Sequence, residues 1–345
     1  MSEKDIEVVF VGDSYVQRPD PDSAFIYVGD YLRAADIAFC NLETVIADPQ
    51  YLVPEHCRRG PRTDEWMLDA YLRAGIKVVN VANNPSMYKG VEGLLRTIDL
   101  LDGAGIAHAG GGRNLAEARR PAMVERKGVR VAFVSRTSVF AITAPATPER
   151  GGVAVVRVKT SYEPPERFFE MPGVPPIIHT VPDPTDVAAM REDVRAAKEQ
   201  ADVVVMSWHW GVSPTGGGTG ELVDYQVEMG HAAIDAGADL VIGHHPHLVQ
   251  PIEVYKGKVI FYSIANLVHD LSERHRNQAT ILARCWIRDR QIREVSFVPG
   301  WIDENNQPRF QKPIDLPEVV RHVQQISGSF GTQFNVREDE IIVCT

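Results

Sequence analysis

The stretch Gly237-Ala-Asp-Leu-Val-Ile-Gly-His-His-Pro-His247 joins a short apolar run to three histidines. Residues 240–242 are apolar and Gly243 follows them, which predicts a buried strand that ends in a polar loop. Three protonated imidazoles this close together would repel one another, whereas neutral imidazole is a common ligand for Zn, Mn, Fe or Ni. A polar loop with chance histidines is the plainer interpretation. A His-His-Pro-His sequence at a strand end instead favours a metal or catalytic site.

Polar residues follow four other apolar runs in the same way. They are Asp13 after residues 8–11, Glu43 after 37–40, Asn84 after 77–81 and His209 after 203–206. Helical patterns separate these runs, so we expect successive β-α units around one sheet in a layered α/β domain. Each polar residue alone has a plainer explanation as a helix cap or a turn residue. Because the ends of parallel strands share one edge of a sheet, we expect these residues to converge with His245 and His247.

Six oxygen and nitrogen donors at one sheet edge predict a site for one or two divalent ions. We expect Mn, Fe or Zn, with carboxylates that supply charge and imidazoles that supply affinity. The chemistry of such a site is the activation of water and the polarisation of a substrate oxygen.

The same residues resemble the motif series of the CapA family, which is named for poly-γ-glutamate capsule synthesis. This family belongs to the calcineurin-like metallophosphoesterase superfamily. The motifs occur in order as Gly12-Asp13, Asn41-Leu-Glu43, Asn83-Asn84, His209-Trp-Gly211, the 237–247 stretch and Tyr262-Ser-Ile-Ala-Asn266. The resemblance implies a four-layer α/β/β/α sandwich with a metal site at the sheet edge. It also implies the metal-site residues, with Glu43 as the bridging carboxylate: Asp13, Glu43, Asn84, His209, His245 and His247.

The sequence departs from this family at Pro85, where the family has a histidine. In the superfamily that histidine helps to protonate the leaving group. The leading hypothesis is a metal-dependent hydrolase that acts on an amide, ester or phosphoester of a small molecule or peptide. Its expected catalytic residues are Asp13, His247 and His269, and His269, His56 or Tyr88 is the expected substitute for the missing acid.

Two other functions stay open. A cofactor-independent peptide epimerase or isomerase would use Asp13 with His247 or His269 as an acid-base pair on opposite faces of a substrate carbon. This reaction has no leaving group, which agrees with the loss of the acid at Pro85. A poly-γ-glutamate-related binding protein without catalysis is the third possibility, because a fold does not fix a function.

Several polar and aromatic residues near the motifs are expected to contact the substrate. Trp210 offers an aromatic wall, although core packing is its plainer role. The basic residues beside His56 suit a carboxylate or a phosphate, although a solvated loop explains them too. The expected substrate-binding residues are His56, Arg59, Tyr88, Trp210, His244 and Asn266.

The composition is that of an ordinary globular protein, with 345 residues, 44% hydrophobic and 24% charged. The formal net charge of -10 argues against a general nucleic-acid binder. No stretch approaches the roughly 20 apolar residues that span a bilayer, and the first residues lack the apolar segment of a signal peptide. The four cysteines show no Cys-x-x-Cys pairing. We therefore expect a cytoplasmic protein with no membrane partner; its oligomeric state is not predicted.

The domain organisation is expected to be one domain over residues 1–300 and a C-terminal extension over 301–345 that packs on it. A proline-rich insertion from about 143 to 185 carries Pro164-Pro165 and Pro175-Pro176, which predicts irregular backbone. Its aromatic residues, Phe168 and Phe169, predict that it packs against the domain. Long loops in compact domains often act as lids or substrate walls.

Overall fold

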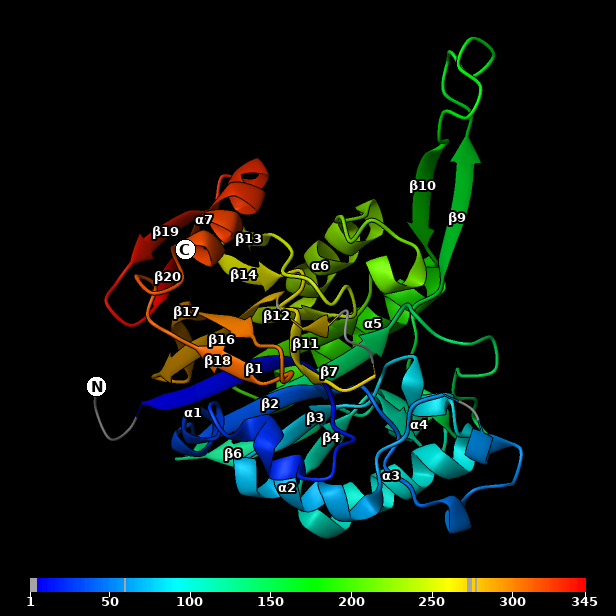
Figure 1. Cartoon of the computed structure of the whole chain (residues 1–345), viewed down its shortest axis with the longest axis vertical. Helices are drawn as coiled ribbons and strands as arrows, with labels where there is room; N and C mark the ends of the chain where they lie inside the picture. Colours follow the sequence, from blue (N-terminus) through cyan, green and yellow to red (C-terminus); the bar gives the residue numbers. More distant parts are fainter. Residues whose placement is uncertain (1–4, 59, 272–274, 277) are drawn as a thin grey trace.

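A sheet of ten strands forms one half of the molecule's centre (Figure 1). The computed structural model describes residues 5–58, 60–271, 275–276 and 278–345. Across this sheet the strands run in the order β19 (Gln333–Val336), β20 (Ile341–Cys344), β17 (Gln291–Ile302), β16 (Gln278–Arg288), β1 (Ile6–Tyr15), β2 (Ile37–Leu42), β3 (Val78–Asn80) and β4 (Ala107–Ala109). In addition, β15 (Asn266–His269) pairs with β1, and β18 (Pro308–Phe310) pairs with β17.

A second sheet of six strands packs on the first. Its order is β13 (Ile252–Tyr255), β14 (Lys258–Phe261), β12 (Leu240–His244), β11 (Val203–His209), β7 (Val129–Thr137) and β6 (Ala122–Arg126). The two sheets share one apolar core, in which Phe39 of β2 stacks on Phe133 of β7 with ring centroids 5.5 Å apart. The central strands are apolar on both faces because both faces are covered.

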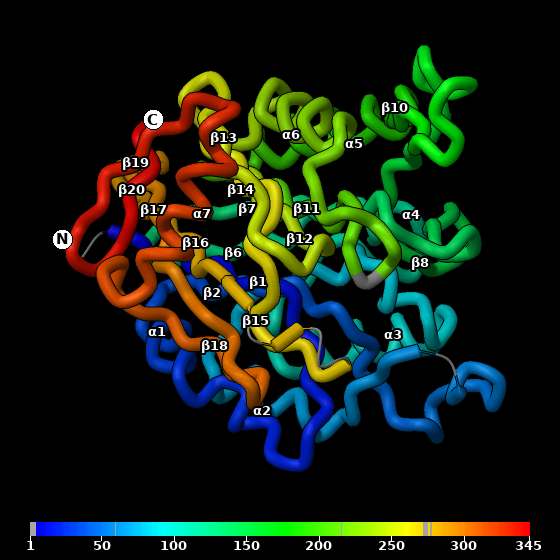
Figure 2. The backbone as a smooth tube through the Cα atoms, turned by 45° about the horizontal axis from the view of Figure 1, so that its top comes forward, coloured from blue at the N-terminus to red at the C-terminus, as the bar shows by residue number. Residues whose placement is uncertain are grey.

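Helices cover the outer faces of both sheets (Figure 2). On the ten-stranded sheet lie α1 (Gly29–Ala34), α2 (Leu68–Ala74) and α3 (Gly90–Ala104), and on the six-stranded sheet lie α5 (Pro184–Gln200) and α6 (Asp224–Ala236). A short helix, α4 (Leu115–Arg119), follows β5 (Gly111–Gly112), which pairs with β8 (Gly152–Val153). The last helix, α7 (Pro317–Ile326), contributes to the core between the sheets. These layers confirm the predicted α/β fold, a four-layer α/β/β/α sandwich.

The proline-rich insertion differs from its prediction. Residues expected to be irregular form a regular hairpin of β9 (Val158–Glu163) and β10 (Ile177–Pro182), which projects from the body of the molecule (Figure 1). The expected packing holds only for the first part of the insertion, where Val153 and Val156 are buried. It is wrong for the hairpin, in which Phe169 is 84% exposed and Ile178 is 55% exposed. The proline pairs lie just beyond the paired residues, so they limit the strands without interrupting the hydrogen-bond ladder.

The backbone at Gly12 in β1 lies very close to the backbone at Ala265. A Cβ added there would lie 1.9 Å from the carbonyl oxygen of Ala265, where the chain enters β15. The next residue, Asp13, donates its backbone N–H to that same oxygen at 3.0 Å. No residue with a side chain fits between β1 and this segment.

We therefore expect Gly12→Ala to lower the free energy of unfolding by about 3 kcal/mol or more, because neither backbone can yield without breaking the Asp13 bond. Chemical denaturation with a linear extrapolation measures the loss. The matched control is Gly103→Ala in α3, where an added Cβ meets nothing within 4 Å. There the alanine is expected to stabilise by up to about 1 kcal/mol. Equal stability of the Gly12 variant and the wild type would contradict the argument.

Candidate metal centre

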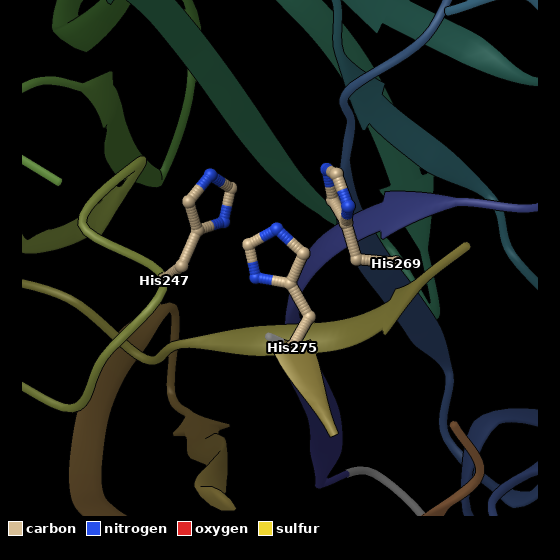
Figure 3. A group of neighbouring side chains, drawn as sticks. All are labelled: His247, His269 and His275. Atoms are coloured by element: carbon tan, nitrogen blue, oxygen red, sulfur yellow. The ribbon is translucent and has the colours of Figure 1, made fainter. Parts of the chain in front are cut away.

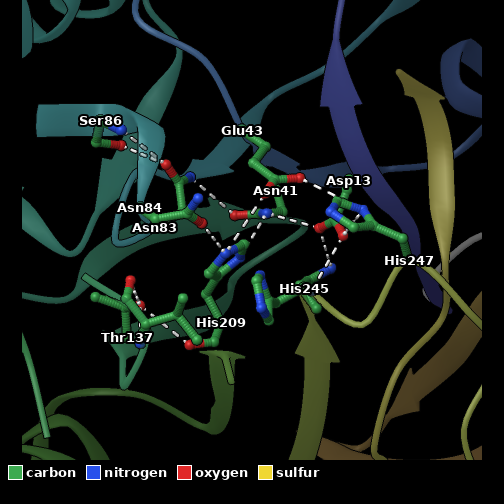
Figure 4. A network of polar contacts seen from close by, with 12 residues as sticks. Asp13, Asn41, Glu43, Asn83, Asn84, Ser86, Thr137, His209, His245 and His247 are labelled. Carbon is green, nitrogen blue, oxygen red and sulfur yellow. Dashed lines mark hydrogen bonds and ion pairs between the residues drawn. The ribbon is translucent and has the colours of Figure 1, made fainter. Parts of the chain in front are cut away.

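Strands from both sheets bring the six predicted donors to one place (Figure 4). The ten-stranded sheet supplies Asp13 within β1 and Glu43 directly after β2, and Asn84 follows β3 by a short turn. The six-stranded sheet supplies His209 at the end of β11, and His245 and His247 in the loop after β12. The site therefore lies where the two sheets meet. The structure brings all six residues together, although they span 234 positions of the chain from 13 to 247.

The loop after β12 holds its histidines in an unusual backbone conformation. His245 has a φ of 96° and His247 a φ of 59°, both in the left-handed region that non-glycine residues seldom adopt. Asp13 stabilises this turn, because its Oδ2 accepts the backbone N–H of His245 at 3.0 Å. Such strain is typical of functional sites, where the surrounding structure holds it in place.

Two groups of donors share Glu43. We call Asp13, Glu43 and His247 the first position, and Glu43, His209 and His245 the second position; within each, the ligand atoms lie within 4.8 Å of one another. The Oε2 atom of Glu43 lies 3.8 Å from His247 Nδ1, and its Oε1 atom lies 3.6 Å from His209 Nε2. Each carboxylate oxygen thus faces a different position. Asn84 adjoins the second position, with its Oδ1 2.7 Å from His209 Nε2.

The donor spacing fits a divalent ion at each position. Two ligands that each lie about 2.1 Å from one ion are about 3.0 to 3.5 Å apart. The distance from Asp13 Oδ2 to His247 Nδ1 is 3.2 Å, and the contacts of Glu43 are only slightly longer. Among the described residues, Glu43 Oε2 and His245 Nδ1 are buried and have no hydrogen-bond partner. Buried polar atoms are rarely left unpaired, so an ion suits these residues.

An asparagine network supports the donors from behind. Asn41 donates from Nδ2 to Asp13 Oδ1 at 2.7 Å, and the same nitrogen lies 3.1 Å from His209 Nδ1. The Oδ1 of Asn41 accepts from Asn80 and Asn83 at 2.9 and 3.1 Å. Neutral amides of this kind orient ligands without adding charge. The sequence motifs include Asn41 and Asn83, but strand position alone gives no sign of this role.

Burial and the charges of neighbouring groups shift the pKa values of the donors in different directions. Burial lowers the pKa of His247, but the carboxylates of Glu43 and Asp13 outweigh it and raise that pKa to about 9. Burial raises the pKa of Asp13, yet its hydrogen bond and charge interaction with His247 hold it well below the usual range. Burial raises the pKa of Glu43 well above its usual value and lowers that of His245 to about 3. Asp13 and His247 therefore behave as a buried ion pair.

Two of the predicted substrate-binding residues lie in the core. Trp210 is fully buried, stacks on Trp208 with ring centroids 5.2 Å apart, and donates from Nε1 to the carbonyl oxygen of Tyr262. His244 is also fully buried, with its Nδ1 3.5 Å from Asp13 Oδ1 and its ring 6.0 Å from that of Phe39. Trp210 lies on the face of the six-stranded sheet that the helices cover, whereas His244 lies on the opposite face, between the two sheets.

Of the other four residues that were predicted to bind the substrate, the three that the structure describes lie at different distances from the donors. Asn266 is buried against His247, with its Oδ1 2.8 Å from His247 Nδ1, so it contacts the imidazole of the first position. Tyr88 accepts a hydrogen bond from Asn84 Nδ2 at its hydroxyl, at 2.9 Å. His56 lies in a short 3-10 helix (His56–Arg58) beside the start of α3, and its Nδ1 is 3.6 Å from Glu92 Oε2. Arg59 lies outside the described residues.

A third group of side chains adjoins the first position (Figure 3). His269 ends β15, and its Nε2 lies 3.6 Å from Glu43 Oε2. His275 also belongs to this group, but it follows no apolar run, so its position in the sequence gives no sign of a site. Its ring lies 4.3 Å from that of His269 and 4.6 Å from that of His247, measured between centroids.

Comparisons with known proteins agree with the motifs. A family model described as bacterial capsule synthesis protein PGA_cap matches residues 7–271. The capsule biosynthesis protein CapA of Bacillus anthracis is 27% identical over 328 residues, which cover 94% of this chain and 72% of that protein. The PGA biosynthesis protein CapA of Bacillus subtilis is 29% identical over 321 residues, 90% and 72% of the two chains. A "Probable polyglutamine synthesis accessory protein" of Mycobacterium tuberculosis is 34% identical over 242 residues, 69% and 56% of the two chains. The resemblance to the CapA family is thus confirmed.

Within the part of the chain that the structure describes, each helix is too short or too polar to cross a bilayer.

Proposed function

Since this chain belongs to the bacterial capsule synthesis protein PGA_cap family, we propose that it is a metal-dependent hydrolase acting on an amide, ester or phosphoester of a small molecule or peptide. The observation that supports this most is Glu43, whose two carboxylate oxygens face two separate groups of donors. A carboxylate shared in this way suits two neighbouring divalent ions, and two-metal sites are typical of hydrolases.

The ligand set supports Mn, Fe or Zn as the proposed cofactor, because it mixes carboxylate oxygen with imidazole nitrogen. Ions bound there would supply activation of water at neutral pH and polarisation of a substrate oxygen. The chain's own part is to hold the carboxylates of Asp13 and Glu43 together in a buried site. In the metal-free protein the positive charge of His247 offsets the negative charge of Asp13.

The proton for the leaving group needs a source other than residue 85, because proline has no proton to donate. We propose the Tyr88 hydroxyl, which is half-buried and bonded to Asn84 beside the second position. A phenol is a weak acid, so this assignment suits a leaving group that needs only late protonation.

The epimerase alternative now depends on Asp13 with His269. Asp13 Oδ2 and His247 Nδ1 are 3.2 Å apart, which leaves no room for a substrate carbon between them. The names of the relatives refer to capsule, PGA and polyglutamine synthesis. Peptides with γ-glutamyl bonds therefore belong among the substrates to test, and binding of such peptides without hydrolysis is the third possibility. The cytoplasmic location stays a prediction.

The test is the metal content of protein purified without chelator, measured by plasma emission beside a His247→Ala variant. We expect one or two equivalents of Mn, Fe or Zn in the wild type. We expect the variant to bind the first-position ion at least about 100-fold more weakly, because even changes to outer-shell partners cost 10- to 100-fold. The control is His322→Ala, which removes an exposed histidine of α7 and should change nothing.

Hydrolysis is then measured with the loaded wild type on phosphoesters, simple amides and γ-glutamyl peptides. Turnover of one class that His247→Ala loses supports the proposal. A wild-type protein that cannot be loaded with any of these metals would overturn it. Binding of γ-glutamyl peptides without cleavage would favour the non-catalytic alternative.

A further inference from the structure

We propose that His269 is an additional ligand of the first position and makes it a nitrogen-rich site that prefers Zn or Fe(II). This inference rests on the proposed metal centre and goes beyond its six predicted donors. The Oε2 of Glu43 lies 3.6 Å from His269 Nε2 and 3.8 Å from His247 Nδ1. One carboxylate oxygen thus faces two imidazoles at the spacing of donors around a shared ion.

The fold delivers His269 to this place through a parallel strand pair. The strand β15 runs beside β1, with Asn266 opposite Asp13 and His269 opposite Tyr15. The ring of His269 packs on that of Tyr15 with centroids 5.5 Å apart, and its backbone N–H donates to Asn306 at 3.2 Å. The side chain is therefore held by its neighbours and leans toward Glu43.

His269 is 3% exposed, and its Nδ1 is buried with no hydrogen-bond partner among the described residues. The ligand atoms of His247, His269 and His275 lie within 4.8 Å of one another, and the three rings stand close together (Figure 3). Three buried imidazoles repel one another when protonated, so this group is suited to a cation other than the proton.

His275 has a different role in this arrangement. Its Nδ1 lies 3.3 Å from Asn266 Nδ2, and Asn266 in turn contacts His247. An amide that contacts both rings fixes their orientation, which identifies His275 as a positioning residue. With two imidazoles and two carboxylates, the first position resembles zinc and non-haem iron sites more than magnesium sites, which favour oxygen ligands.

The experiment compares the wild type with His269→Ala and His269→Gln, and uses His322→Ala as the control. Each protein is stripped, reloaded with Zn²⁺ and titrated against a chromophoric chelator, and the Co²⁺-loaded forms are compared by visible absorption. We expect two zinc equivalents in the wild type. In both His269 variants, one equivalent should keep its affinity and the other should weaken by about 100-fold. The Co²⁺ spectrum should change in both, because glutamine preserves volume but not the imidazole.

Circular dichroism and a thermal melt establish that each variant is folded. The glutamine variant separates the loss of the imidazole from the effect of the cavity that alanine leaves. Two equivalents with wild-type affinity in both variants would overturn this inference and leave the proposed function standing. A wild type that takes up no zinc, iron or manganese would overturn both.

Discussion

Replacing Glu43 by glutamine is expected to lower hydrolytic turnover by roughly a thousandfold, which corresponds to about 4 kcal/mol of transition-state stabilisation. It is also expected to reduce bound metal from two equivalents to one or fewer. Glutamine has the same shape, so packing is preserved, and Glu43 is only 2% exposed. The amide has one oxygen in place of two and no negative charge, so it cannot serve both positions. Its NH₂ group would face either His209 or His247 as a donor that cannot bind an ion.

Plasma emission and steady-state kinetics on the same preparations measure both effects. The matched control is Glu92→Gln, a change of the same type at a carboxylate that contacts His56 and has a side chain 51% exposed. That variant should keep its metal and stay close to wild-type turnover. Two full equivalents in Glu43→Gln would show that the two positions do not share this carboxylate.

The six donors could be predicted from the sequence because each follows an apolar run. Parallel strands place such positions at one edge, so Asp13 and His247 meet without any knowledge of the connecting segments. The structure agrees with this for every one of the six. The rule works because it depends on strand direction and not on side-chain packing.

The features that could not be predicted from the sequence depend on contacts between helices and strands. Trp210 belongs to the core because β11 is covered by helices on that face, which a single strand does not reveal. His275 follows no apolar run, and its contact with the rings of His247 and His269 becomes visible only in the folded chain. The hairpin of β9 and β10 departs from the prediction because its proline pairs lie just beyond the paired residues, where they do not break the strands.

The stability of the protein in the presence of a chelator is expected to fall by on the order of 3 kcal/mol between pH 6.5 and 9. Despite burial, Glu43 and Asp13 raise the pKa of His247 to about 9 in the folded protein, above its ordinary value of 6.5. When folding raises the pKa of a base, the extra stability is fully present at pH values below the pKa in the unfolded chain. This stability is lost as the pH rises through the pKa in the folded protein. Chemical denaturation in EDTA at several pH values measures the slope, and His247→Gln should be flat across this window.

Saturating Zn²⁺ is expected to abolish this alkaline loss. An ion bound between Asp13, Glu43 and His247 requires the neutral imidazole, so it takes the place of the proton and its affinity rises as the pH increases. At a metal concentration about 1,000 times the dissociation constant, the gain is about 4 kcal/mol for each site. Calorimetric titrations in buffers of different ionisation enthalpy would record the displaced proton at pH 7.5. A pH slope that is the same with zinc and with EDTA would mean that His247 keeps its proton and does not bind the ion, and the first position would then lack its central ligand.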